Sequence, residues 1–225
     1  MLLMFLLLFL LTLAVPDAFA HGVSDDDKAF IVQSTGVRLL PFTYLGAKHM
    51  VTGYDHLLFL FGVIFFLYRM KDVGIYVSLF AIGHSVTLLY GVLSGTHVNP
   101  YLVDAIIGMS VVYKALDNLG AFKQILGFQP NTKAAVLVFG FFHGFGLATK
   151  LQQFTLSKNG LLPNILAFNV GVELGQLLAL GAILIAMGFW RSTDAFRQQA
   201  FAANTALMAA GFVLIGYQLT GYFNK

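Results

Sequence analysis

Six runs of apolar residues, each long enough to cross a lipid bilayer as a helix, dominate the chain after its first forty residues. Inside a bilayer the backbone must satisfy its own hydrogen bonds, so only helices and closed β-barrels can span it. Barrel strands would be short and would alternate between apolar and polar residues, whereas these runs are long and continuous. We therefore predict an all-α, polytopic membrane protein, a bundle of six transmembrane helices. The predicted spans are Pro41–Tyr68, Val73–Ser94, Asn99–Asn118, Lys133–Leu151, Leu161–Trp190 and Ala200–Phe223.

The composition excludes a soluble fold and several classes of partner. Apolar residues make up 58% of the chain and charged residues 10%, against roughly 45–50% and about 25% in a typical soluble domain. The 13 basic and 10 acidic residues are scattered, so no nucleic-acid surface is expected. No GxxxxGK[ST] motif is present, so no bound nucleotide is expected. The chain has no cysteine, which excludes thiolate ligands. The lipid bilayer is the expected surrounding, and a homo-oligomer is left open.

The N-terminus is predicted to be a cleaved secretory signal peptide. An apolar core of fifteen residues is followed by the small-x-small sequence at residues 18–20. The alternative is an uncleaved first transmembrane helix, because no Lys or Arg precedes the core. The signal peptide places the mature N-terminus on the periplasmic side of a bacterial inner membrane. Basic residues divide too evenly between the two sides to orient the chain by the positive-inside rule. The predicted regions are a signal peptide at 1–20, a periplasmic lead-in at 21–40 and a six-helix transmembrane domain at 41–225.

Ionisable side chains inside the predicted spans point to a metal site. Such groups are costly in a bilayer and mark a site or a pathway by default. The first span holds His49, Asp55 and His56, the second holds His84 and the fourth holds His143. A single buried histidine is more often a hydrogen-bonded core residue than a ligand, but four with carboxylates favour a ligand set. Imidazole suits Ni, Co, Cu and Zn, and a carboxylate can compensate charge or orient a ring.

Helix geometry makes a specific prediction for the first span. On a continuous helix, His49 and His56 share a face but lie about 10.5 Å apart along the axis. One ion with bonds of about 2 Å cannot reach both histidines. Either the helix breaks near Gly53 or the two histidines are successive stations, and we favour the break. Asp55 lies about 120° around the helix from His49. It is better placed to orient a histidine on a neighbouring helix, or to compensate charge, than to join His49.

The fifth span combines a polar face with a face of small residues. Asn169, Glu173 and Gln176 fall within about 60° of arc, and Gly171 and Gly175 point nearly opposite. Glycines at this spacing let helices approach closely, so the glycine face is predicted to pack on a neighbour. Asn169 and Glu173 are added to the candidate ligands, with a structural carboxylate as the alternative for Glu173.

Three further polar residues belong near the outer face. Cleavage after residue 20 would make His21 the new N-terminus, where the α-amine and imidazole together can chelate Cu(II) or Ni(II). His97 lies in a loop and is expected to be solvated. Asp104 opens the third span and is either part of the ion path or an interfacial acid stabilised by the start of its helix.

Taken together, these motifs resemble the HupE/UreJ family of membrane proteins. The family is associated with nickel supply, and in some members cobalt supply, to hydrogenase, urease or cobalamin pathways. The resemblance implies transport roles for His49, Asp55, His56 and His143. Nickel permeases of this kind carry a glutamate where this chain has Lys150, and Glu173 is one candidate for the missing carboxylate. The matching motifs are the signal peptide, H-x5-D-H at 49–56, GHS at 83–85, FHGFG at 142–146 and FNVGVELGQ at 168–176.

The sequence thus predicts a permease, not an enzyme, for a divalent transition-metal cation. Nickel or cobalt is the favoured ion, with copper and zinc as alternatives. The ion would enter from the outer face, exchange water for imidazole and carboxylate, and leave to the cytoplasm. Two other classes stay open: an intramembrane metalloenzyme whose histidines hold a fixed metal, and a metallochaperone or assembly partner.

Overall fold

The computed structural model describes residues 25–152 and 157–224, and every regular element in these residues is a helix. The predicted all-α class is therefore confirmed for this part of the chain. The predicted signal peptide and His21 lie outside the described residues. The helices are α2 (Asp25–Gln33), α3 (Leu39–Thr52), α4 (Tyr54–Ile64), α5 (Met70–Ser94), α6 (Pro100–Asn118), α7 (Ala121–Leu126), α8 (Thr132–Leu151), α9 (Leu161–Arg191) and α10 (Ala195–Phe223).

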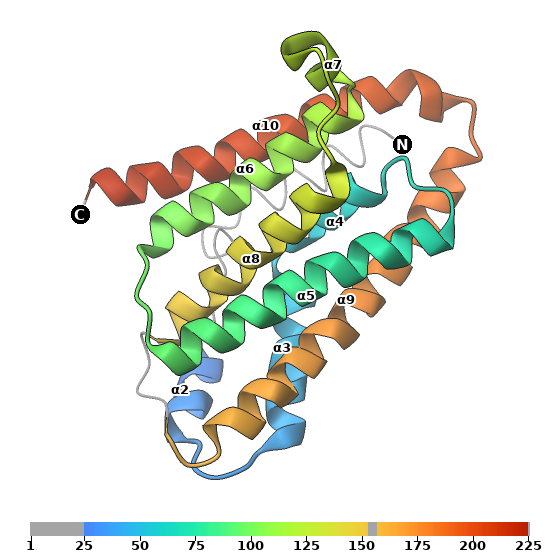
Figure 1. The fold of residues 1–225 in the computed structure, drawn as a ribbon. Helices are drawn as coiled ribbons and strands as arrows, with labels where there is room; N and C mark the ends of the chain where they lie inside the picture. Colours follow the sequence, from blue (N-terminus) through green and yellow to red (C-terminus); the bar gives the residue numbers. More distant parts are fainter. Residues whose placement is uncertain (1–24, 153–156, 225) are drawn as a thin grey trace.

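Within residues 25–152 and 157–224, four helices, α5, α8, α9 and α10, are long and apolar enough to cross a membrane. The first predicted span is divided into α3 and α4, of 14 and 11 residues, and each is shorter than the roughly 20 residues a span needs. The third predicted span, α6, has 19 residues but carries Asp104, Lys114 and Asp117. Figure 1 shows α3 and α4 behind α5 and α8, with α6 and α10 side by side along one edge of the bundle and α9 along the other. Six membrane crossings remain a prediction.

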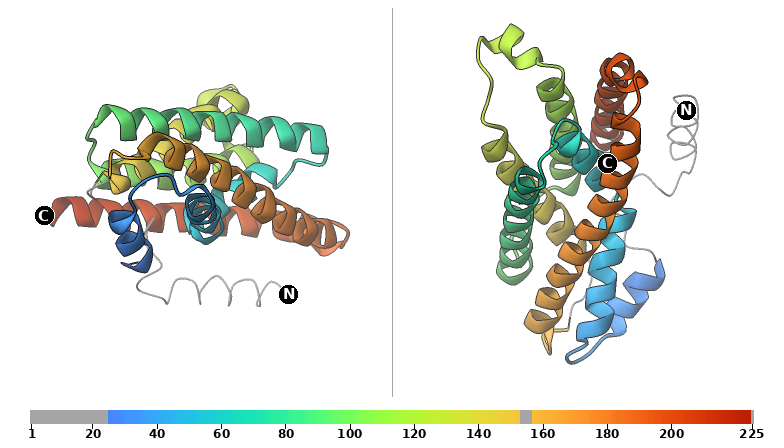
Figure 2. Two further views of the ribbon diagram at one scale, coloured as in Figure 1. Left: turned by 90° about the horizontal axis from the view of Figure 1, so that it is seen from below. Right: turned by 90° about the vertical axis from the view of Figure 1, so that its right-hand side faces the viewer.

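Six helices pack closely in pairs, with glycines at the contacts: α3 with α9, α5 with α8, and α6 with α10. The left view of Figure 2 looks nearly along α3 and shows it beside α9. A Cβ atom on Gly171 of α9 would lie 1.9 Å from the carbonyl oxygen of Thr43, and one on Gly175 would lie 2.6 Å from that of Ala47. Gly211 of α10 meets α6 in the same way. The predicted packing face of the fifth span is confirmed, because only a hydrogen atom fits at these positions.

The α5–α8 pair is fixed by both sterics and a hydrogen bond. A Cβ atom on Gly144 of α8 would lie 2.2 Å from the carbonyl oxygen of His84, and one on Gly83 of α5 would also strike the α8 backbone. The Thr87 hydroxyl donates to the carbonyl of Phe141 across the interface at 2.7 Å. The contact therefore sets both the depth and the rotation of the segment of α5 that carries His84.

The predicted lead-in contains a helix that packs on α3. The Lys48 ammonium of α3 lies 2.7 Å from the Asp27 carboxylate of α2. The rings of Phe30 and Phe42 have centroids 6.2 Å apart. Residues 25–33 are therefore attached to the bundle by a charged contact and an apolar one.

Candidate metal centre

The break between α3 and α4 brings His49 and His56 together. Gly53 has extended backbone angles, φ −74° and ψ 101°, and it ends α3 and begins α4. Its amide donates to the His49 carbonyl at 2.9 Å, and its carbonyl accepts from the Leu57 amide at 3.0 Å. The imidazole centroids lie 5.2 Å apart, about half the axial separation on a continuous helix. The predicted break at Gly53 is confirmed.

His56, on α4, is the centre of a cluster of four histidines, and the other three lie on α3, α5 and α8. Its ring centroid lies 5.2 Å from that of His49, 6.0 Å from that of His84 on α5, and 4.9 Å from that of His143 on α8. The three rings of His56, His84 and His143 are fully buried, whereas His49 is partly exposed. The sequence prediction that these residues belong to one site is consistent with this arrangement, in which His49 is the least enclosed of the four residues although its Nε2 is buried.

Two of the rings are oriented through Nδ1. Asp55 Oδ1 lies 2.9 Å from His56 Nδ1 and also accepts the His56 backbone amide at 2.8 Å. His143 Nδ1 donates to the Phe139 carbonyl oxygen at 2.8 Å. With the proton on Nδ1, Nε2 carries the lone pair that can bind a metal, which is the usual arrangement of metal-binding histidines. Asp55 therefore orients the histidine next to it in the chain.

His84 has the most unusual surroundings of the four. Its ring is fully buried and stacked on Phe80 at a centroid distance of 6.1 Å, and neither ring nitrogen has a hydrogen-bond partner in the part of the chain that the structure describes. Leaving a buried donor or acceptor unsatisfied costs about 1–3 kcal/mol. A cation bound to one nitrogen would remove part of that cost, so His84 is better suited to holding a ligand than to packing a core.

The spacing of the rings fits shared coordination, but their present orientation does not. Imidazole binds metals at about 2.0–2.1 Å, which places the ring centroids of two tetrahedral ligands about 5 Å apart. The observed distances from His56 range from 4.9 to 6.0 Å. Within residues 25–152 and 157–224, no three His, Asp or Glu side chains are arranged to hold a metal ion as they stand. Binding would therefore require ring rotation.

The fifth predicted span contributes less than its motif indicated. Glu173 is exposed on the surface of α9, outside the buried cluster. Asn169 is buried; its amide nitrogen donates to the Ile165 carbonyl at 3.2 Å, and its oxygen has no partner. From α9, the Phe168 ring approaches the cluster, with its centroid 6.1 Å from that of His49. The structure therefore does not bring Glu173 together with the other candidates.

An ion pair beside the cluster was not identified from the sequence. Lys150 Nζ of α8 lies 2.8 Å from Asp104 Oδ2 of α6, with side chains 14% and 5% exposed. Asp104 is close enough to Asp55 and His56 to interact electrostatically with them. The only sequence signals were an acid near a helix start and a lysine near a helix end, and neither reveals their pairing.

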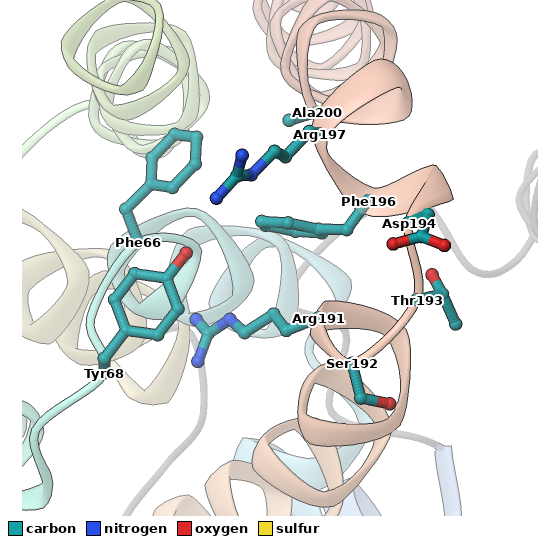
Figure 3. Close-up of a pocket in the computed structure, with 9 residues that line it drawn as sticks. All are labelled: Phe66, Tyr68, Arg191, Ser192, Thr193, Asp194, Phe196, Arg197 and Ala200. Carbon is teal, nitrogen blue, oxygen red and sulfur yellow. The ribbon is translucent and has the colours of Figure 1, made fainter.

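A cavity of about 850 Å³ lies at the far end of α4, away from the histidines. Figure 3 shows Arg191 and Arg197 pointing to the same side, toward Phe66 and Tyr68. The Arg191 guanidinium donates to the carbonyl oxygens of Phe65 at 2.8 Å, Leu67 at 3.0 Å, and Ile64. This end of α4 is about 12 Å from His56 along the helix. The cavity therefore belongs to the cap of α4 and not to the histidine cluster.

The comparisons with known proteins bear on the whole described chain. Neither the curated proteins nor the solved structures contain a match. The family model described as "HupE / UreJ protein" matches residues 25–225, which includes every residue of the histidine cluster. The chain belongs to the HupE/UreJ family.

Proposed function

We propose that the protein is a membrane permease for a divalent transition-metal cation, with Ni(II) or Co(II) favoured and copper and zinc as alternatives. The observation that carries the proposal is the fully buried His84. Both of its ring nitrogens lack hydrogen-bond partners, and its ring centroid is 6.0 Å from that of His56. Imidazole is a good ligand for Ni, Co, Cu and Zn when it is neutral.

Family membership and four apolar helices support the setting. Together they indicate a membrane protein related to nickel or cobalt. In the proposal, α3 together with α4 forms the first of six spans of a bacterial inner membrane, and α5, α6, α8, α9 and α10 form the others. Residues 1–20 are removed, and the mature N-terminus is periplasmic. The chain carries no P-loop motif, so metal moves down its own gradient or with a coupled ion.

The residues divide the work of moving a cation through the bundle. His49, the least enclosed of the four histidines, accepts the ion first and exchanges its water for imidazole. Because the Gly53 break places His56 beside His49, the ion passes to His56 without crossing a helical turn of apolar surface. Asp55 holds the His56 ring through Nδ1 and supplies negative charge, which increases the basicity of Nε2. His84 and His143 then provide the next nitrogens from α5 and α8.

Metal flux through reconstituted protein tests the proposal. Liposomes containing the purified protein are loaded with a metal-sensitive dye, and uptake of Ni(II), Co(II), Zn(II) and Cu(II) is followed. His56→Ala removes the central ring, and Asp55→Asn removes its negative partner at nearly constant volume. Both variants are expected to lose at least tenfold of the Ni(II) or Co(II) flux, in line with the effects of removing ligands and their orienting groups. His97→Ala is the matched control, because His97 is exposed.

The outcomes separate the three function classes. Flux that is unchanged by both substitutions contradicts the permease mechanism. Tight, stoichiometric metal retention without flux instead favours the metalloenzyme or the metallochaperone. A loss of flux that His97→Ala reproduces would point to general damage and would also count against the assigned roles.

A further inference from the structure

We propose that Asp104 is a second binding site for the divalent cation, and that the Lys150 ammonium occupies it in competition with the cargo. The inference rests on the proposed transport function and goes beyond the histidine cluster. It makes Lys150 a tethered cation that the metal must displace before it reaches His49 and His56.

Asp104 has unused capacity to bind a cation. Its side chain is 5% exposed, and only Oδ2 approaches Lys150. The other oxygen, Oδ1, is buried and has no hydrogen-bond partner. A buried carboxylate normally has its oxygens satisfied, because removing the charge from water is costly. A divalent cation with oxygen affinity would satisfy Oδ1 where Lys150 does not.

Lys150 has few partners for a largely enclosed lysine. Its Nζ lies 2.8 Å from Asp104 Oδ2, and it has no further partner among residues 25–152 and 157–224. An ammonium group has three donors to satisfy. Lys150 is the next-to-last residue of α8, and its flexible stem can carry the charge toward the helix end and water. Displacement therefore breaks one contact and hydrates a charge.

A glycine lies beside the buried oxygen Oδ1 of Asp104. Gly146 is one turn before Lys150 on α8, and a Cβ atom there would lie 2.8 Å from Ile107 Cδ1 and 3.3 Å from Asp104 Oδ1. Any larger side chain at residue 146 would press on this oxygen. The unsatisfied oxygen therefore faces the glycine backbone, with Lys150 on the other oxygen.

The pair is also placed to control the histidines by charge. Lys150 lies within electrostatic range of His49, and Asp104 lies within range of His56. With Lys150 in place, its positive charge opposes a second cation at the cluster edge. With Lys150 displaced, the Asp104 carboxylate attracts one. Displacement of Lys150 by the metal ion would therefore make the electrostatic potential at His49 more negative.

Two substitutions at Lys150 should move metal affinity in opposite directions. Lys150→Met removes the competing charge at similar length, and about tenfold tighter apparent Ni(II) affinity with slower release is expected. Lys150→Arg offers a bidentate partner for the Asp104 carboxylate, which should strengthen the pair and weaken affinity several-fold. Asp104→Asn should also weaken affinity, by about tenfold, because Lys150 keeps its charge and loses its counter-ion. The matched control is Lys114→Met, which removes another buried lysine, one that pairs with Asp117 on α6.

The measurements are the KM and maximal rate of Ni(II) uptake in liposomes, and metal retained by purified protein after equilibrium dialysis. Opposite shifts of KM in Lys150→Met and Lys150→Arg, with Lys114→Met at the wild-type KM, support the inference. Equal KM and retention in wild type and both Lys150 variants overturn it while leaving the permease intact. Absence of flux in wild type overturns the permease and the inference together. If Lys150→Met does not fold, Lys150→Arg and Asp104→Asn still test the sign of the effect.

Discussion

Gly53→Ala is the substitution that most directly tests how the broken helix builds the site. A Cβ atom on residue 53 would lie 2.9 Å from His56 Nδ1, 3.1 Å from the His49 carbonyl oxygen and 3.3 Å from Asp55 Oδ1. The backbone angles at Gly53, φ −74° and ψ 101°, are open to any residue. The change therefore adds no backbone strain and acts by displacing the His56 ring and its Asp55 partner.

The expected loss follows from the size of that displacement. Ordinary contact begins near 3.4 Å, so the ring must move by about 0.5 Å, beyond the roughly 0.2 Å tolerance of metal–ligand bonds. Disturbing the group that orients a metal-binding histidine typically costs 10–100-fold in affinity, or about 1.4–2.8 kcal/mol. Overpacking costs about 1–3 kcal/mol of folding free energy, and replacing glycine returns up to about 1 kcal/mol. The protein should therefore stay folded while its metal affinity falls.

Ni(II) binding by calorimetry in detergent, beside the liposome flux assay, measures this loss. Gly74→Ala on α5 is the matched control, because a Cβ atom there meets nothing within 4 Å. We expect wild-type affinity for Gly74→Ala and at least tenfold weaker affinity for Gly53→Ala. Equal affinities in the two variants would refute the role assigned to the break.

Three other substitutions test the packing and the cluster separately. Gly144→Ala should lower the melting temperature by several degrees, because its Cβ atom would lie 2.2 Å from the His84 carbonyl oxygen and overpacking costs about 1–3 kcal/mol; Gly181→Ala, in open space, should leave it unchanged. His84→Leu should weaken Ni(II) affinity at least tenfold yet keep or raise the melting temperature, since it removes two unsatisfied buried nitrogens; a large fall in melting temperature would contradict this. Arg191→Met should lower the melting temperature through lost hydrogen bonds to the end of α4 while leaving metal affinity unchanged, and altered affinity would show that the cap and the cluster are coupled.

The bounds of a helix were predictable where the apolar run in the sequence ends at the same residue as the helix. The fifth predicted span begins at Leu161, as α9 does, and the fourth ends at Leu151, as α8 does. The sixth predicted span begins at residue 200, whereas α10 begins at Ala195. Residues 197–199, Arg-Gln-Gln, interrupt the apolar run there, so hydropathy alone could not include this first turn. The short α7 in the connection between α6 and α8 was not predicted, because six residues carry too little periodic signal.

Within the site, the geometry inside one span was predictable from the sequence. Which side of a helix faces the core of the bundle was not. The Gly53 break followed from comparing the axial separation of His49 and His56 on an ideal helix with the length of a metal–imidazole bond. Both quantities concern one span, so no knowledge of the other helices was needed. The direction in which Glu173 points was different, because angles on one helix place residues relative to each other and not relative to the core. Asn169 and Gln176 are buried and Glu173, about 40–60° away on the helix, is exposed.

The histidine cluster lies where differently constrained elements meet, and glycines set those constraints. Glycine packing fixes α8 against α5, so the backbones that carry His84 and His143 are held as one unit. Glycine packing also fixes α3 against α9, which holds His49, whereas His56 lies beyond the break on the shorter α4. The far end of α4 is held by hydrogen bonds from Asn118 to the Gly62 carbonyl and from Arg191 to the carbonyls of Phe65 and Leu67. The position of His56 relative to the other rings is therefore set at Gly53 on one side and by these hydrogen bonds on the other, and not within either close-packed pair.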